Sequence, residues 1–191
     1  VEQTVVIDYT GQAGAMAAQL PKAKTLDAFR VRESEAPIAF AQMPFDHPLY
    51  ILYSSGTTGI PKCIVHRAGG ILLKHLSEIV LNSDVKPGDR LFYFTTCGWM
   101  MWNWLVSGLA AGATLLLYDG SPFHPSERAL FDFADAADMT IFGTSAKYID
   151  SVRKTGWRAR DTHNLTNLLS MMSTGSPLSA ENFDFVYDAV K

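Results

Sequence analysis

A dense run of small and hydroxyl-bearing residues ends in a lysine between Tyr53 and Lys62, with the order Tyr-Ser-Ser-Gly-Thr-Thr-Gly-Ile-Pro-Lys. Glycine lets a backbone approach a ligand closely, and successive backbone N–H groups with neighbouring hydroxyls can surround an anion. Lysine adds a compact positive charge. The run therefore predicts a phosphate-binding loop. We expect its contacts to come from Ser54, Ser55, Gly56, Thr57, Thr58, Gly59 and Lys62.

The loop is not a Walker A motif, which needs Gly-x4-Gly-Lys-Ser/Thr followed by a helix. Here Ile60 and Pro61 separate the second glycine from Lys62. The apolar run 48–53 is typical of a buried strand, and the β-branched run 63–66 indicates a second strand. We therefore expect a hairpin with the loop at its tip. An ordinary Ser/Gly turn is the simpler alternative.

The loop resembles the signature segment of the adenylate-forming, acyl-activating superfamily. Residues 98–104 (Gly-Trp-Met-Met-Trp-Asn-Trp), 108–114 and 118–122 extend the likeness to short-chain acyl-CoA synthetases, in particular to those that activate acetoacetate. The resemblance runs from about residue 48 to the C-terminus. It implies an α/β fold, part of the large N-terminal domain of an acyl-CoA synthetase, with a mostly parallel sheet flanked by helices and a phosphate-loop hairpin.

The resemblance also implies a reaction. A ligase of this kind joins acetoacetate to ATP, releases pyrophosphate, and transfers the acyl group from the adenylate to CoA, so ATP, Mg²⁺ and CoA are the expected cofactors. Lys62 and Thr57 take the catalytic roles, and Lys62 would neutralise charge on the leaving pyrophosphate. Two alternatives stay open: an acetate- or propionate-type short-chain acyl-CoA synthetase, and a non-catalytic nucleotide-binding fragment.

A stripe of Trp and Met residues follows Gly98 and could form either an acyl pocket or ordinary core. Spacing alone favours core packing, and we expect Trp104 to be core. The resemblance implies an apolar box for a short acyl chain, with an amide that could donate to a substrate keto oxygen. The residues concerned are Trp99, Met100, Met101 and Trp102 for the box and Asn103 for the amide.

Near the C-terminus, Gly175-Ser176-Pro177 resembles the segment that packs on adenine in acyl-CoA synthetases. Many relatives carry an acidic residue where Ser176 stands, so a contact through that side chain is not implied here. The alternative is a simple strand-to-helix turn, since Pro177 and Ser179 also suit the start of a helix.

From Arg90 onward, expected strands alternate with helices of roughly ten residues, which favours a parallel sheet. Ligands bind beyond the carboxyl ends of the strands in such sheets. Glycine-bearing segments lie at three of these ends, residues 97–98, 142–144 and 174–177. We expect them to line one cleft together with the phosphate loop.

The helix pattern is specific enough to predict which faces are buried. A helix over 71–81 should bury a stripe of Leu72, Leu76 and Ile79. A helix over 100–110 is apolar nearly all round, so we expect it to be buried and to end at Gly112. A strand is expected within 165–172. Capping residues are expected at Thr25, Ser126 and Ser179.

Bulk properties narrow the classes of function. The 191 residues carry a net charge of −3 and no basic run, so no nucleic-acid partner is expected, and the partners should be small molecules. Cys63 and Cys97 have no metal-binding spacing and are expected to be buried or free thiols in the cytoplasm. No metal site, no membrane span and no signal peptide are expected. The pair Asp132 and Asp135 is assigned no acid–base role.

The family's remaining functional residues are not found in this sequence. The resemblance implies a later Glu that binds Mg²⁺, an Asp that holds the ribose, and a lysine on a separate C-terminal domain. We therefore expect residues 1–191 to be an internal fragment of one AMP-binding, acyl-adenylate-forming domain, with the C-terminal domain absent and no catalysis by the fragment alone.

Overall fold

The computed structural model describes residues 2–30, 37–54 and 59–191. The chain divides into two compact units, Val1–Gln42 and Met43–Lys191. The first contains β1 (Thr4–Val6), α1 (Ala13–Gln19), β2 (Ala23–Thr25) and α2 (Leu26–Phe29), and its two strands pair in parallel. The Thr25 hydroxyl accepts a hydrogen bond from the Ala28 N–H at 3.3 Å, which confirms the predicted cap.

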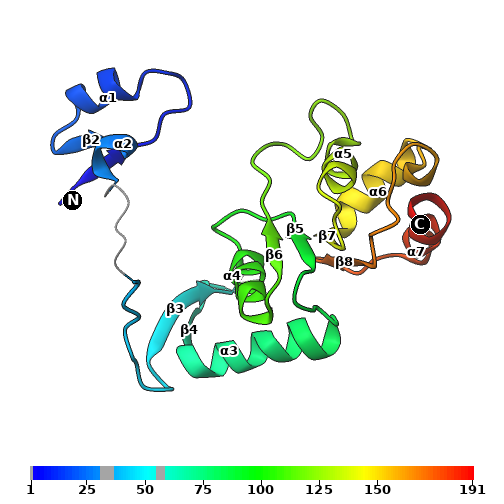
Figure 1. The fold of residues 1–191 in the computed structure, drawn as a ribbon, viewed down its shortest axis with the longest axis horizontal. Helices are drawn as coiled ribbons and strands as arrows, with labels where there is room; N and C mark the ends of the chain where they lie inside the picture. The colour runs from blue at the N-terminus through cyan, green and yellow to red at the C-terminus, as the bar shows by residue number, and fades with distance from the viewer. Residues whose placement is uncertain (1, 31–36, 55–58) are drawn as a thin grey trace. The chain divides into compact units, whose positions relative to one another are not determined.

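The second unit is built on a four-stranded sheet in the order β6-β5-β7-β8 (Figure 1). Its strands are β5 (Arg90–Tyr93), β6 (Thr114–Leu116), β7 (Ile141–Ser145) and β8 (Ser170–Thr174), and all neighbouring pairs are parallel. This confirms the predicted α/β class. The last strand begins at Ser170, later than expected, because residues 165–168 form a turn in which the Leu168 N–H donates to the Leu165 carbonyl at 3.0 Å.

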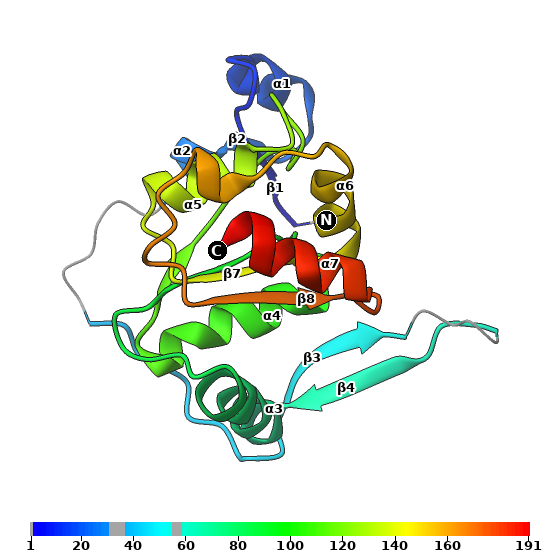
Figure 2. The ribbon, with the colours of Figure 1, turned by 90° about the vertical axis from the view of Figure 1, so that its right-hand side faces the viewer.

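Helices cover both faces of this sheet, and each face has its own core. On one face lie α3 (Ala68–Leu76), the π-helical turn η1 (Ser77–Asn82), α4 (Met100–Ser107) and the 3-10 turn η2 (Gly108–Ala111). On the other lie α5 (Ala129–Ala136), α6 (Ala146–Lys154), the turn η3 (Ala159–Asp161), α7 (Ala180–Phe185) and η4 (Val186–Val190). Figure 2 shows α4 and α7 on opposite sides of β8.

The face that carries α5 and α6 is held by aromatic packing. The Phe131 ring meets the Phe142 ring edge-on at 5.3 Å between centroids, and Phe92 lies 5.6 Å from the same ring. The Ser145 hydroxyl caps α6 by accepting from the Tyr148 N–H at 3.2 Å, so the helix starts directly after β7. These contacts fix the carboxyl end of β7 relative to the helices behind it.

The two strands of the expected hairpin pair with each other, although the burial of the first strand was predicted wrongly. Strands β3 (Pro48–Tyr53) and β4 (Cys63–Arg67) pair antiparallel, and residues 55–58 between them lie outside the described residues. Tyr50 and Leu52 are half-buried, whereas Leu49, Ile51 and Tyr53 are exposed. The apolar run reads as a fully buried strand, but within this chain only one of its faces packs against other elements.

The stripe predicted for the first helix of this unit is wrong in part, because Ile79 is buried as expected but Leu72 is not. Leu72 is 46% exposed, and the buried positions on α3 and η1 are His75 and Ile79. The helical spacing of the buried residues was predicted correctly. The buried face was placed on Leu72 rather than on His75, because a histidine is not expected in a core. His75 can be buried because a polar partner on α4 meets it.

The helix α4 is buried on one side only, contrary to expectation. Trp104 and Leu105 face the core, while Met100 and Val106 are exposed. Gly112 ends the helical segment with a left-handed φ of 78°, as predicted.

Two of the three predicted caps differ in detail. α5 begins at Ala129, and the Ser126 hydroxyl accepts from the Arg128 N–H at 3.2 Å within the preceding turn rather than capping the helix. Ser179 occupies the N-cap position of α7, but its side chain makes no capping hydrogen bond there.

A polar link joins α3 to α4. His75 Nδ1 lies 2.8 Å from Ser107 Oγ, and that hydroxyl donates to the Asn103 carbonyl at 3.0 Å. Because the single hydroxyl proton is directed to Asn103, Nδ1 must be the donor to Ser107, which fixes the tautomer of a neutral ring. Burial lowers the pKa of His75, the charge of His66 lowers it further, and Glu78 opposes both.

A glycine on β7 lies directly against an aromatic ring from β5. A Cβ atom at Gly143 would overlap the Tyr93 ring, which lies directly against this position. We predict that Gly143→Ala lowers the free energy of unfolding by about 1–3 kcal/mol, because the buried ring cannot move aside freely. Urea unfolding measures the effect.

The matched control for that substitution is Gly70→Ala. Gly70 lies in α3 with no heavy atom within 4 Å of a built Cβ, so alanine should be neutral or stabilise by up to about 1 kcal/mol. Equal effects of the two substitutions would contradict the role assigned to the Tyr93 ring.

The buried histidine predicts a pH dependence of stability. Its folded pKa lies below the unfolded value of about 6.5, so its contribution is complete above that pH and is lost as the pH falls towards the folded pKa. We predict that His75→Gln removes part of the fall in unfolding free energy on acidification, measured by urea unfolding at a series of pH values. An NMR titration in which His75 has an ordinary or raised pKa would refute this account.

Candidate active site

The carboxyl ends of β5, β7 and β8 meet around a cavity of about 260 Å³, which we call the edge pocket. It is lined by Tyr93, Phe94, Thr95, Thr96, Trp99, Met101, Thr144, Ser145, Thr174 and Gly175. The predicted meeting of segments 142–144 and 174–177 at one cleft is therefore confirmed in part. Cys97 and Gly98 are not among the described residues that line this pocket.

A second and more apolar cavity, of about 460 Å³, lies among the hairpin, α3, α4 and β8, and we call it the hairpin pocket. The hairpin contributes Tyr50, Leu52 and His66, and α4 contributes Met100, Met101 and Trp104. The remaining lining comes from Ile71, Lys74, His75, Glu78, Tyr93, Met172, Ser173 and Thr174. Lys74 and Glu78 form an ion pair with each other at this site.

The two pockets share a wall formed by Tyr93, Met101 and Thr174. The Tyr93 hydroxyl donates to the Thr144 carbonyl at 3.0 Å, and its ring meets Trp104 edge-on at 6.0 Å between centroids. Burial raises the pKa of Tyr93 to about 12, against a smaller lowering by a backbone hydrogen bond involving Thr174. The phenol therefore stays protonated and keeps donating at ordinary pH.

The structure brings together part of the predicted acyl-binding segment. Trp99, which is 69% exposed, lines the edge pocket, Met100 lines the hairpin pocket, and Met101 lines both. Trp102 packs against the core on the α4 face of the sheet instead. Asn103 is not among the residues that line either pocket, and its described hydrogen bond is the one its backbone carbonyl accepts from Ser107.

The neck of the predicted phosphate loop is closed by two hydrogen bonds. The Ser54 N–H donates to the Lys62 carbonyl at 3.0 Å, and the Lys62 N–H donates to the Ser54 hydroxyl oxygen at 3.1 Å. These bonds set the position at which the loop leaves β3 and returns to β4. Gly59 and the Lys62 side chain are exposed, and Ser55, Gly56, Thr57 and Thr58 lie outside the described residues.

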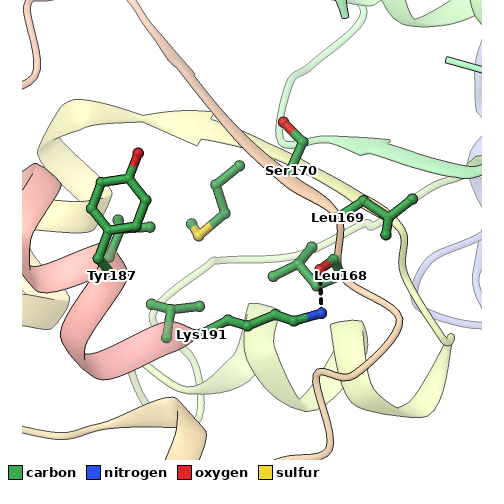
Figure 3. A pocket seen from close by; sticks show the side chains of 8 residues that line it. Leu168, Leu169, Ser170, Tyr187 and Lys191 are labelled. Atoms are coloured by element: carbon green, nitrogen blue, oxygen red, sulfur yellow. Dashed lines mark hydrogen bonds between the residues drawn. The ribbon is translucent and has the colours of Figure 1, made fainter. Parts of the chain in front are cut away.

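The predicted adenine segment is divided between two cavities. Gly175 lines the edge pocket, whereas Ser176 and Pro177 line a third cavity of about 510 Å³ beside β8, α7 and η4. At the other end of this strand a smaller hollow lies between β8 and the last helical turn (Figure 3). There the Lys191 ammonium donates to the Leu168 carbonyl at 2.7 Å.

Sequence reasoning missed several residues that line these cavities. Tyr93 and Trp104 were assigned to a strand and to core, yet both line the hairpin pocket. His66 was not among the predicted site residues, but its ring lies 5.2 Å from that of Tyr50 in the wall of the same pocket. The alternation of Tyr50 and Leu52 along the strand was the signal that could have identified this face.

Other titratable groups have structural roles or lie in the open. Asp132 bonds to His163 Nε2 at 2.7 Å and Asp135 accepts from the Asn164 N–H at 3.1 Å, so both fasten a loop. Cys63 and Cys97 are free and exposed. Within residues 2–30, 37–54 and 59–191, no three His, Cys, Asp or Glu side chains are grouped as metal ligands. None of the helices in these ranges has the length and apolar character of a membrane span.

Proteins with sequences similar to this chain are named as CoA synthetases. The chain is 57% identical over 188 residues to an acetoacetyl-coenzyme A synthetase of Rhizobium meliloti (strain 1021), which covers 98% of this chain and 29% of that protein. It is 48% identical over 176 residues to an acetoacetyl-CoA synthetase of Rattus norvegicus, covering 91% and 26%. A malonamoyl-CoA synthetase of Penicillium aethiopicum is 46% identical over 183 residues, covering 88% and 25%.

The fold has a solved counterpart. An acetoacetyl-CoA synthetase from Streptomyces lividans matches 99% of this chain with a TM-score of 0.86 and 40% sequence identity, over 28% of its own length. The chain thus spans less than a third of the length of these relatives. A family model described as AMP-binding enzyme matches residues 2–191. The chain therefore belongs to the AMP-binding enzyme family.

Proposed function

We propose that this chain is an internal part of one acyl-adenylate-forming domain, residues 1–191, in a longer ligase that activates acetoacetate. The observation that supports this most directly is the edge pocket, a small cavity lined by Trp99 and Met101 at the carboxyl ends of parallel strands. Ligands of open α/β sheets bind at that edge. The names of its relatives point to the same acid. The two exposed thiols suit a reducing cytoplasm.

The proposed reaction has two steps. An acetoacetate carboxylate oxygen attacks the α-phosphorus of ATP, the bond to the bridging oxygen breaks, and pyrophosphate leaves with the electron pair of that bond. The CoA thiolate then attacks the acyl carbon of the adenylate and releases AMP. Positioning of the two reactants and stabilisation of the charge that develops on pyrophosphate supply the catalysis.

The loop from Ser54 to Lys62 is proposed to hold the β- and γ-phosphates. The two hydrogen bonds at its neck hold Ser54 against Lys62, which suits a loop that must present its N–H groups and hydroxyls to one anion. Lys62 and Thr57 are assigned to the leaving pyrophosphate. Gly175, Ser176 and Pro177 are proposed to pack on adenine.

A Mg²⁺ ion is proposed to arrive with the nucleotide, because magnesium is commonly bound through substrate phosphates and one or two carboxylates. Among the described residues no three such ligands are grouped, so the proposal relies on the phosphates to bring the ion. It would supply charge neutralisation, and the roles proposed above for Lys62 and Thr57 do not depend on it.

A second acid deserves testing because one relative is named for it. Malonamate and acetoacetate are both short acids with a carbonyl group two carbons from the carboxylate, and they differ in a terminal amino or methyl group. Four threonines line the edge pocket together with Trp99, namely Thr95, Thr96, Thr144 and Thr174. A pocket of this kind suits a short acyl chain that carries one polar atom.

The experiment that tests the proposal is acid-dependent pyrophosphate exchange by the full-length enzyme that contains this chain. The acids are acetoacetate, malonamate, acetate, propionate and butyrate. We expect the largest kcat/KM with acetoacetate. A preference for acetate or propionate would keep the reaction class and discard the proposed substrate. Exchange with none of the acids would leave a non-catalytic nucleotide-binding role.

The role of the lysine is tested by Lys62→Ala in the same enzyme. We predict that acetoacetate-dependent pyrophosphate exchange slows by about 10²–10³-fold, the effect typical of losing one group that stabilises transition-state charge. The matched control is Lys154→Ala, since Lys154 is an exposed lysine paired with Asp150 on α6. Unchanged exchange in Lys62→Ala, or an equal loss in both variants, would remove the lysine from the mechanism.

A further inference from the structure

We propose that Met101, held against Tyr93, is the partition that limits acyl-chain length, and that the hairpin pocket is the space it closes off. The inference rests on the proposed function, because it takes the edge pocket as the acyl site. Removing the Met101 side chain would then join the two cavities and admit longer unbranched carboxylic acids.

The partition follows from which residues line which cavity. Tyr93, Met101 and Thr174 line both pockets, so the cavities lie on either side of the same side chains. The edge pocket holds about 260 Å³ and the hairpin pocket about 460 Å³. Joined, they fall within the usual range of small-molecule sites, about 300–1,000 Å³.

The space behind the partition suits a hydrocarbon chain. Its apolar lining comes from Met100, Trp104, Met172, Leu52 and Ile71. The charged groups at this site are already paired, since Lys74 bonds to Glu78. An alkyl chain that enters this space would therefore exchange water for apolar contacts and would leave no buried charge unpaired.

The two side chains of the partition differ in how firmly they are held. Tyr93 is buried, lies against Gly143, and donates to the Thr144 carbonyl at 3.0 Å. Met101 is only partly buried, and methionine is unbranched with three rotatable bonds. Met101 is thus the part that can be shortened without disturbing the sheet, and it is a specificity residue because it lies beside the acyl group.

The test compares Met101→Ala with Met101→Leu in the full-length enzyme. The readout is the ratio of kcat/KM for 3-oxohexanoate to that for acetoacetate. We expect Met101→Ala to raise this ratio by about tenfold or more, since each methylene bound in an apolar pocket changes kcat/KM by about 10–200-fold. Met101→Leu keeps the bulk of the side chain and should leave the ratio near the wild-type value.

A second pair of variants tests the route taken by the chain. Ile71 lines the hairpin pocket and is not among the residues lining the edge pocket. Ile71→Ala alone enlarges the space behind the closed partition and should not raise the ratio. Ile71→Phe added to Met101→Ala refills that space and should abolish the gain. A gain that survives the Phe substitution would show that the longer chain lies elsewhere.

The proposal is wrong if a folded Met101→Ala enzyme, with wild-type thermal unfolding, shows no change in the ratio. If that variant does not fold, Met101→Val is measured in the same way and must show a smaller gain in the same direction.

Binding of hexanoate, followed by the fluorescence of Trp99 and Trp104, gives a readout that does not need turnover. Its Kd should fall by about tenfold in Met101→Ala. An inactive wild-type enzyme would refute the proposed function, while this binding assay would still decide the partition.

Discussion

The contact between the Tyr93 ring and the backbone of Gly143 is the constraint on which the rest of the site depends. It brings β5 and β7 together at their carboxyl ends, where the Tyr93 hydroxyl also bonds to the Thr144 carbonyl. A side chain at position 143 would push the ring away. The ring would then no longer separate the two cavities or pack against Trp104. A single glycine thus sets both the local sheet geometry and the shape of the candidate site.

The hydrophobic cores on the two faces of the sheet hold its strands in place, so that residues at the carboxyl ends of the strands are free to line the edge pocket. Behind the sheet, Phe131 and Phe142 pack within a large aromatic cluster, and Ser145 starts α6 directly at the end of β7. In front of it, Trp104 and Leu105 anchor α4, so the start of that helix places Trp99 and Met101 at the edge pocket. The residues proposed to contact a ligand are therefore carried by elements that are anchored in a core on their opposite side.

The sequence was sufficient to predict the parallel sheet, because alternating strand and helix patterns have few other solutions. It was also sufficient for features that depend on local chemistry, such as the Thr25 cap of α2 and the end of a helical segment at Gly112. It failed where burial depends on a partner elsewhere in the chain. His75 replaces Leu72 as the buried residue because Ser107 supplies a hydrogen bond, and no periodicity in α3 contains that information.

The same limit applies to the site. A resemblance identified the segment with Trp99 and Met101, but it could not distinguish side chains that line a cavity from Trp102, which packs into the core. It also gave the Asn103 side chain a substrate contact, which stays a prediction, since the bond described for this residue is the one that its backbone carbonyl accepts from the Ser107 hydroxyl. The direction of each side chain on a short helix depends on how that helix packs against the sheet, and this packing is determined by contacts with distant parts of the chain.

The central proposal is that the acyl group is activated at the carboxyl edge of the sheet. The most direct measurement is a structure of the full-length enzyme with a non-hydrolysable analogue of acetoacetyl-adenylate bound. The account predicts the acyl group in the edge pocket between Trp99 and Met101, with the phosphate facing the loop that Ser54 and Lys62 close. An acyl group bound beside β8 at its amino end, or on the far side of α7, would contradict it.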